Sequence, residues 1–231
     1  MKNFIYGKNS VLEAIKNDYP IKKIYLASNL KNQAIKFKNI TYLTTKEMDK
    51  LIKGNHQGYI AEIEAFKYDD IGVILKDKAQ AILILDHIQD PQNFGAIIRS
   101  ANVFGIKHII IPKDRSIDVT PVVLKISSGG FRDTKIIKVS SLFEATEFLK
   151  KNRFWIYATA LDKNAKKISD TNFSFPIAII MGNEHSGVSK TLLKHADEII
   201  YIEQDKQAIQ SLNVNAATAI CLYEIFKQSK K

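Results

Sequence analysis

The chain has 231 residues, 45% of them hydrophobic, and carries a formal net charge of +10. This length allows one large domain or two small ones with a packed core, and the charge favours an anionic partner, with nucleic acid ahead of an acidic membrane surface. A single cysteine excludes an internal disulfide, and no Cys/His spacing is typical of a zinc site. No apolar run has the length of a signal peptide or membrane span, so we expect a soluble cytoplasmic protein without membrane or metal.

Residues 1–66 are predicted to form a small α/β domain. Asn9 and Ser10 precede an amphipathic run, as in a capped helix, and Thr45 is placed to cap a second helix. Strands are expected at residues 24–26 and 41–43, and an edge or half-buried strand at residues 58–63.

The same region carries a basic stretch. From Tyr19 to Lys46 there are six lysines and no acidic residue, with aromatic side chains interleaved. A solvated basic face would have the same composition, but the missing acidic residues favour a surface that faces RNA. The candidate RNA-binding residues are Lys22, Lys23, Lys36 and Lys38.

A charged linker is predicted at residues 67–79, with one short helix at 71–75, before a larger domain at 80–231. Continuous apolar runs then alternate with helical ones, which indicates a mostly parallel sheet covered on both faces. The strands are expected at residues 81–85, 108–111, 136–139, 154–158, 177–181 and 199–202, and the helices at 94–104, 141–150, 189–195 and 212–226.

Polar elements follow three of these strands, where open α/β sheets bind their ligands. In the first, residues 86–101, Asn93 is expected to start a helix, and Arg99 follows among small residues. The planar guanidinium suits a phosphate or carboxylate, although a structural ion pair would account for it equally well. In the second, residues 182–189, two glycines flank Glu184 and predict a tight loop that a ligand approaches closely.

The third element, residues 211–220, has a polar head followed by a small, apolar helix body. Ser211 and Asn213 could cap the helix or face a ligand. Cys221 lies on the apolar body and is predicted to be a core residue instead of a nucleophile.

Together the patterns N-x-G-x-x-x-R-x-A, G-N-E-x-x-G and S-L-N-V-N-A-A resemble the three motifs of the SpoU-type (TrmH/RlmB-like) RNA 2′-O-ribose methyltransferases of the SPOUT superfamily. The resemblance runs from about residue 79 to residue 227. Residues 6–14 and 56–58 are similar to the ribosomal-protein-like substrate domain of the branch that methylates a guanosine ribose of 23S rRNA.

The resemblance implies an α/β fold with a C-terminal trefoil knot, S-adenosylmethionine as methyl donor, and a homodimer with RNA, most often ribosomal RNA, as partner. The catalytic positions it implies are Asn93, Arg99, Glu184, Ser211 and Asn213. The cofactor-binding positions it implies are Thr159, Ala160, Gly182, Ile202 and Leu212.

Two features depart from the family pattern. The loop 203–210 is charged and lacks the usual Pro and Gly, and Asn215 stands where Ser is common. The role of Arg99 is also open, between the family's general base and a phosphate clamp. Because an unperturbed guanidinium has a pKa of about 12.5 or higher, fewer than about one in 10⁵ is neutral at pH 7. We therefore favour the clamp.

The dimer prediction has some support in the sequence itself. Apolar residues occupy more of the last helix than one core-facing side requires, namely Ala216, Ala219, Ile220, Tyr223 and Phe226. A fully buried helix in a monomer is the alternative. For the function, the alternatives are a tRNA ribose 2′-O-methyltransferase and a non-catalytic RNA-binding or ribosome-assembly protein.

Overall fold

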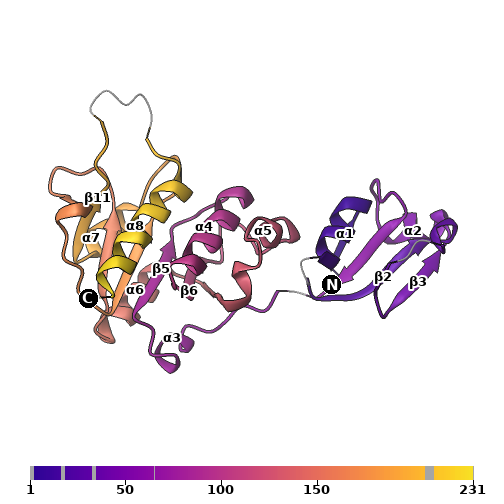
Figure 1. The fold of residues 1–231 in the computed structure, drawn as a ribbon, viewed down its shortest axis with the longest axis horizontal. Coiled ribbons are helices and arrows are strands. Elements are labelled where there is room, and N and C mark those ends of the chain that lie inside the picture. The colour runs from indigo at the N-terminus through magenta and orange to yellow at the C-terminus, as the bar shows by residue number, and fades with distance from the viewer. Residues whose placement is uncertain (1–2, 17–18, 33–34, 65, 206–210, 231) are drawn as a thin grey trace. The chain divides into compact units, whose positions relative to one another are not determined.

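The protein is described by a computed structural model that covers residues 3–16, 19–32, 35–64, 66–205 and 211–230, the side chain of Arg132 excepted. It divides into two compact units (Figure 1). The smaller unit comprises Met1–Lys67 with Val119–Lys125, and the larger unit comprises Tyr68–Asp118 with Ile126–Lys231.

The smaller unit contains a four-stranded sheet with the strand order β1-β4-β2-β3. β2 and β3 are parallel, whereas β4 is antiparallel to both β1 and β2. Its elements are β1 (Asn3–Tyr6), α1 (Lys8–Lys16), β2 (Ile21–Ala27), η1 (Ser28–Leu30), β3 (Ile40–Leu43), α2 (Thr45–Leu51) and β4 (Tyr59–Ile63). Helix α5 (Pro121–Ile126) begins in the stretch that clusters with this unit.

β4 is an inner strand, and the expectation of an edge or half-buried strand at residues 58–63 is wrong. Tyr59, Ile60 and Ala61 are all buried. Tyr59 and Ala61 pack with Val11 of α1, and Ile60 packs with Met48 of α2. Because both faces of β4 are covered, apolar side chains are accommodated on both.

The helix starts of the smaller unit also differ from the prediction. α1 begins at Lys8, so Asn9 and Ser10 lie within the helix and do not precede it. α2 is capped by Thr44, because the Thr44 side chain accepts from Glu47 N–H and the Glu47 carboxylate accepts from Thr44 N–H at 2.8 Å. This reciprocal capping box leaves Thr45 as the first helical residue.

The larger unit contains a seven-stranded, all-parallel sheet with the order β7-β6-β5-β10-β8-β11-β9. The prediction of a mostly parallel sheet is confirmed. The elements are α3 (Val73–Lys76), β5 (Ala81–Leu85), α4 (Pro91–Val103), β6 (His108–Pro112), η2 (Gly130–Asp133), β7 (Lys135–Val139), α6 (Leu142–Lys151), β8 (Trp155–Thr159), β9 (Lys166–Lys167), η3 (Ile168–Asp170), β10 (Ile177–Met181), α7 (Lys190–His195), β11 (Glu198–Tyr201) and α8 (Val214–Gln228).

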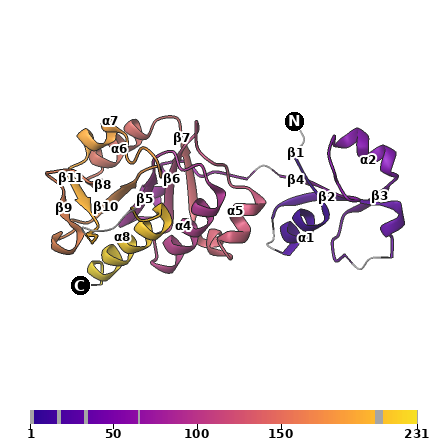
Figure 2. The same ribbon diagram turned by 90° about the horizontal axis from the view of Figure 1, so that it is seen from above.

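Helices cover both faces of this sheet. α4 and α8 lie on one face, and α6 and α7 lie on the other (Figure 2). Side chains of β5 show the effect: Ile82 and Ile84 pack with Leu142 and Leu149 of α6, while the intervening Leu83 is equally buried. The continuous apolar runs in the sequence follow from this double burial.

The segment expected to be a linker packs onto the larger unit. Asp69 lies beside Ile137 of the edge strand β7, with Asp69 N–H donating to the Ile136 carbonyl at 2.9 Å. Ile74 of α3 is fully buried in the core. Ile71, Val73 and Ala79 are partly buried against the same core, so these apolar side chains hold the segment on the sheet edge.

The predicted knot concerns a part of the chain that includes residues 206–210, which lie outside the described residues, so the knot stays a prediction. None of the helices within the described ranges is long and apolar enough to cross a membrane.

Candidate active site

The three polar elements meet at the carboxyl edge of the large sheet. β5 ends at Leu85 and β10 ends at Met181, and these two residues are paired in register. β8 and β11 follow β10 across the sheet and end at the same edge because all the strands are parallel. Loops 86–90 and 182–189 therefore emerge side by side, as predicted for a ligand site of an open α/β sheet.

A chain of three side chains links separate elements at this edge. Asn93 of α4 is 5% exposed, and its Nδ2 donates to Glu184 Oε1 at 2.6 Å. Asn215 of α8 donates from its Nδ2 to Asn93 Oδ1 at 3.0 Å. We call Asn215, Asn93 and Glu184 the amide relay. The structure thus brings together two predicted catalytic residues, and it adds Asn215, which the sequence marks only as a departure from the family pattern.

Helix α4 begins earlier than predicted. Asp90 is its N-cap and accepts from Gln92 N–H at 2.9 Å, and Pro91 occupies the first turn. The prediction that Asn93 starts the helix is therefore wrong. Since Asp90 satisfies the helix start, the Asn93 side chain is free to join the relay.

Arg99 lies on α4, six residues beyond Asn93, which corresponds to about 9 Å along the helix axis. Its side chain is exposed and forms no ion pair with any residue that the structure describes. The alternative of a structural ion pair is thus not realised in the described parts of the chain. The guanidinium is open to an external anion.

Loop 182–187 closes on itself. Asn183 N–H donates to the Gly187 carbonyl at 3.1 Å, and Gly187 N–H donates back to the Asn183 carbonyl at 2.9 Å. A Cβ on Gly182 would lie 2.1 Å from Gly187 C and from Val188 N. Glycine is required here because the chain's own backbone fills the space that a side chain would need. The predicted close approach therefore comes from within the loop.

A buried carboxylate that the sequence analysis missed ties the first two loops together. Asp86 is 2% exposed; its Oδ2 accepts from Ser189 N–H at 2.7 Å, and its Oδ1 lies 2.5 Å from His87 Nδ1. Asn183 Nδ2 in turn donates to the His87 carbonyl at 2.8 Å. An acidic residue directly after a buried strand was the available clue, since such a group must find partners.

The third element is the start of α8. Asn213 is the N-cap, and its Oδ1 accepts from Asn215 N–H at 2.9 Å, while its Nδ2 stays unused among the described contacts. Ser211 is exposed. Cys221, in the helix body, is fully buried, and this burial raises the pKa of its thiol to about 12. The prediction of Cys221 as a core residue is confirmed.

The candidate cofactor residues follow three neighbouring strands. Thr159 and Ala160 lie at the end of β8, where Thr159 Oγ1 donates to the Ile180 carbonyl at 3.1 Å and Ala160 N–H donates to the Ile200 carbonyl at 3.0 Å. Ile202 follows β11. Leu212 is 40% exposed although it is apolar.

The atypical loop after β11 begins with a fixed carboxylate. Glu203 accepts from Ser169 Oγ at 2.6 Å and pairs with Lys167 at 2.9 Å. The hydrogen bond from Ser169, followed by that from Lys167, lowers the pKa of the Glu203 carboxyl. The rest of the loop, from residue 206 on, lies outside the described residues.

In the smaller unit, the parallel pairing of Ile24 with Ile40 brings the basic segments to one end of the sheet. Lys22, Lys36 and Lys38 are exposed there. Lys23 is half-buried and lies opposite Glu62 of β4 in the strand register. The sheet therefore supplies an acidic residue that the window from Tyr19 to Lys46 does not contain.

The two N-terminal motifs of the resemblance contact each other. Lys8 N–H donates to Gln57 Oε1 at 3.1 Å. Gly58 N–H donates to His56 Nδ1 at 3.0 Å, so the His56 Nε2 proton is directed at Asp49 Oδ1, 3.1 Å away. These contacts give the motif residues a role in holding the loop, beside a recess of about 440 Å³.

No group of three or more His, Cys, Asp or Glu side chains within the described ranges could hold a metal ion.

Two family models match the chain. The model described as the SpoU rRNA Methylase family matches residues 80–223. The model described as RNA 2'-O ribose methyltransferase substrate binding matches residues 4–69.

Individual proteins are similar over nearly the whole chain. The 23S rRNA (guanosine-2'-O-)-methyltransferase RlmB of Coxiella burnetii is 33% identical over 238 residues, which are 97% of this chain and 94% of that protein. The uncharacterized tRNA/rRNA methyltransferase slr0955 of Synechocystis is 31% identical over 98% of this chain, which spans 62% of its length. The SpoU methyltransferase AviRb of Streptomyces viridochromogenes, solved with AdoMet, has a TM-score of 0.73 at 19% identity and covers 100% of this chain and 91% of its own, which shows a shared fold.

Proposed function

The chain belongs to the SpoU rRNA Methylase family and is an RNA methyltransferase, and from this premise we propose that it transfers a methyl group from S-adenosylmethionine to a ribose 2′-hydroxyl of RNA. The observation that carries this proposal is the amide relay. Its members Asn93, Glu184 and Asn215 come from the first, second and third motif and meet at the carboxyl edge of the sheet. The solved neighbour that contains AdoMet supports the choice of donor.

The cofactor is proposed to lie against Gly182, Ile202, Leu212, Thr159 and Ala160, at the ends of β10, β11 and β8. S-adenosylmethionine supplies an electrophilic methyl group on a sulfonium. Leu212 offers an apolar surface to the adenine, and backbone groups at the strand ends read its polar edge. Affinity for the cofactor is therefore expected to survive many side-chain changes at this edge.

The acceptor is proposed to be held by the catalytic residues of the motifs. Arg99 clamps a phosphate of the RNA, because its exposed guanidinium has no described ion-pair partner and binds phosphate bidentately. Ser211 and the unused amide of Asn213 hold the ribose hydroxyl. Glu184 orients Asn93 through the 2.6 Å hydrogen bond. Alignment of two bound reactants can lower the barrier by about 7–11 kcal/mol.

For the substrate we propose a guanosine of 23S rRNA. The match of residues 4–69 to a substrate-binding model and the similarity to RlmB of Coxiella burnetii support this choice. A tRNA ribose is the second candidate, because the Synechocystis relative is named for both tRNA and rRNA.

The proposal is tested by transfer of a radiolabelled methyl group to purified ribosomal RNA and, separately, to tRNA. Nucleoside analysis of the labelled RNA then identifies the modified base. We expect 2′-O-methylguanosine in 23S rRNA alone. Label in tRNA alone would overturn the ribosomal assignment, and label on a base instead of a ribose would overturn the reaction.

We propose that the enzyme is a homodimer through α4 and α8, with a knotted C-terminal region. Tyr223 of α8 is 53% exposed and Ile220 is 40% exposed, and Tyr223 stacks edge-on against Phe104 at 5.9 Å. In a two-fold symmetric interface each substitution is present twice, once in each protomer. Tyr223→Asp is therefore expected to lower both dimer content, measured by sedimentation, and activity. A fully active wild-type monomer would contradict the proposal.

The exposed lysines of the smaller unit are proposed to hold the RNA substrate, and the enzyme is proposed to act in the cytoplasm. The combined variant Lys22→Glu, Lys36→Glu and Lys38→Glu should weaken RNA binding and flatten its dependence on salt. Lys53→Glu is the matched control, because Lys53 is an exposed lysine of the same unit outside the basic stretch. An unchanged salt slope in the triple variant would show that RNA binds elsewhere.

A further inference from the structure

The amide relay has a fixed direction. A carboxylate only accepts hydrogen bonds, so Glu184 requires the NH₂ group of Asn93. The Asn93 carbonyl oxygen then faces Asn215, which must present a donor, and its Nδ2 lies 3.0 Å away. Each amide in the chain is thus oriented by the next one. Without a donor at position 215, the buried Oδ1 of Asn93 would lose its described partner.

The Asn215 side chain is not needed to start its own helix. The cap of α8 is formed by Asn213 Oδ1 and the backbone N–H of Asn215, at 2.9 Å. Truncating the Asn215 side chain leaves that hydrogen bond in place. The half-buried side chain reaches across to α4 instead, so its described role lies in the contact with Asn93.

We propose that Asn215 is a positioning residue for the methyl transfer, which holds the Asn93 amide in the one orientation that serves Glu184 and so couples the start of α8 to the motif on α4. The inference rests on the proposed function of Asn93 and Glu184. Asn215 lies on the element that also carries Ser211 and Asn213. If the Asn215 side chain is lost, Asn93 can shift relative to that element. The alignment of the acceptor then changes, although every group that contacts the acceptor is still present.

The first experiment compares Asn215→Ala with Asn102→Ala. Asn102 lies on α4, is half-buried, and has no described side-chain hydrogen bond, so it matches the change in size and chemistry. We expect Asn215→Ala to lower kcat by about 10- to 100-fold, as a small misplacement of a reacting group does. Its KM for RNA, its Kd for S-adenosylmethionine and its cooperative unfolding should stay near wild type. Asn102→Ala should keep wild-type kcat.

The second experiment reverses the relay. In Asn215→Asp the new carboxylate accepts from Asn93, which forces the Asn93 carbonyl toward Glu184, so two acceptors face each other. This variant should lower Tm by about 2–4 °C, which corresponds to one hydrogen bond in a chain of this size. Adding Glu184→Gln supplies a donor to the flipped amide and should restore Tm. Glu184→Gln alone should leave Tm near wild type, because the glutamine oxygen still accepts.

The helix dipole has the opposite effect on the Tm of Asn215→Asp, so the two explanations predict changes of opposite sign. An acidic residue in the first turn of α8 is favoured by the helix dipole, so Asn215→Asp would raise Tm if the relay did not matter. A raised or unchanged Tm for Asn215→Asp, or a double variant no more stable than Asn215→Asp alone, overturns the relay. An unchanged kcat in Asn215→Ala overturns the positioning role. Since the Tm measurements need no substrate, they stand even if the proposed methyl transfer is absent.

Discussion

The two edges of the large sheet differ in how their polar groups are satisfied. The carboxyl edge carries the glycine loop, the amide relay and the start of α8. The amino edge carries a recess of about 690 Å³, whereas the recess beside Asp86 at the carboxyl edge measures about 310 Å³. The larger cavity therefore lies away from the motif residues.

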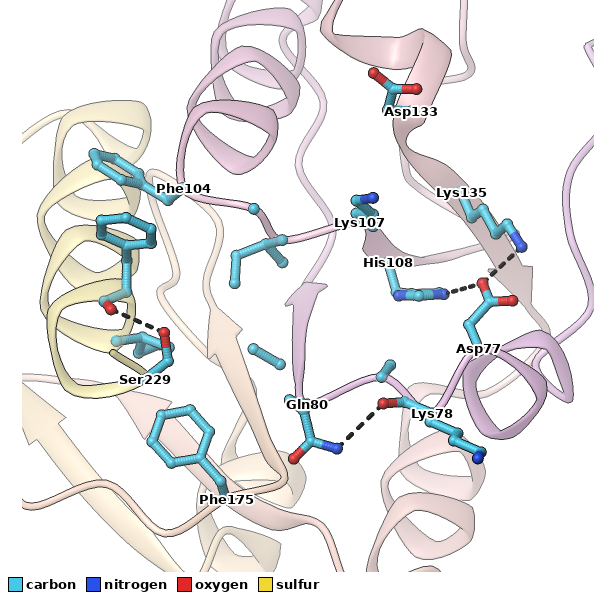
Figure 3. A pocket seen from close by; sticks show the side chains of 16 residues that line it. Asp77, Lys78, Gln80, Phe104, Lys107, His108, Asp133, Lys135, Phe175 and Ser229 are labelled. Atoms are coloured by element: carbon cyan, nitrogen blue, oxygen red, sulfur yellow. Dashed lines mark hydrogen bonds and ion pairs between the residues drawn. The ribbon is translucent and has the colours of Figure 1, made fainter. Parts of the chain in front are cut away.

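Charges at the amino edge neutralise one another. α3, α4 and α8 end there, with Asp77, Phe104 and Ser229 as their C-caps. The carbonyl ends of helices favour cations, which the nearby lysines supply. Lys135 at 2.6 Å and His108 at 2.8 Å converge on Asp77 (Figure 3). The hydrogen bond from Lys135, followed by that from His108, lowers the pKa of the Asp77 carboxyl.

At the carboxyl edge, by contrast, groups with described positions remain unused. Asn213 keeps its Nδ2 after capping α8. Arg99, about 9 Å along α4 from Asn93, is exposed and forms no described ion pair. The candidate site is therefore better identified by hydrogen-bond donors without a described partner than by cavity volume. Glycine and a buried carboxylate hold the loops at this edge.

The largest expected difference between the edges is in activity. Arg99→Ala should lower methylation at least about 100-fold, because the phosphate clamp is lost, while cofactor binding and fold stay intact. Arg99→Lys should be nearly as poor, since a lysine cannot bind phosphate bidentately. Lys107→Ala, in the amino-edge recess, serves as the control and should keep wild-type turnover in the methyl-transfer assay. High turnover by Arg99→Lys would show that catalysis requires only a positive charge at position 99, and not a bidentate clamp.

A second difference is in stability, measured by chemical unfolding of two alanine variants. Gly182→Ala should cost about 3 kcal/mol, because the new Cβ would lie 2.1 Å from backbone atoms that cannot move independently. Gly105→Ala, which lines the amino-edge recess, has open space around its Cβ position and should cost only about 1–2 kcal/mol for its positive φ. Equal costs would show that loop 182–187 relaxes more freely than its hydrogen bonds indicate.

The smallest effect concerns Asp77. Because its pKa is lowered in the folded state, the carboxylate stabilises the fold at neutral pH, and this contribution is lost as the pH falls below about 4. Asp77→Asn should therefore have a slightly lower Tm than wild type at pH 7, and the difference should shrink by pH 3. A difference that stays constant between these pH values would assign the effect to packing.

Six of the seven strands of the large sheet follow from local sequence, with ends that differ from the prediction by at most one residue. The short strand β9, Lys166–Lys167, was not predicted, because two adjacent lysines carry no strand pattern. The run Ile177–Met181 matches β10 as predicted, because five apolar residues flanked by Pro176 and Gly182 leave little choice. The start of α4 was misplaced by two residues. Asp90 as the N-cap and Pro91 in the first turn form a stronger helix start than Asn93.

The amino-acid sequence alone determined the alternation of buried strands and helices, the glycine loop and the family motifs, since these depend on residues close together in the chain. Tertiary structure decided which polar groups meet. Asn93 bonds to residues 91 and 122 positions away, and Lys23 lies opposite Glu62, 39 positions away. Those partners depend on strand order and helix placement, and because a hydrogen bond acts only within about 3.5 Å, no local pattern reveals them.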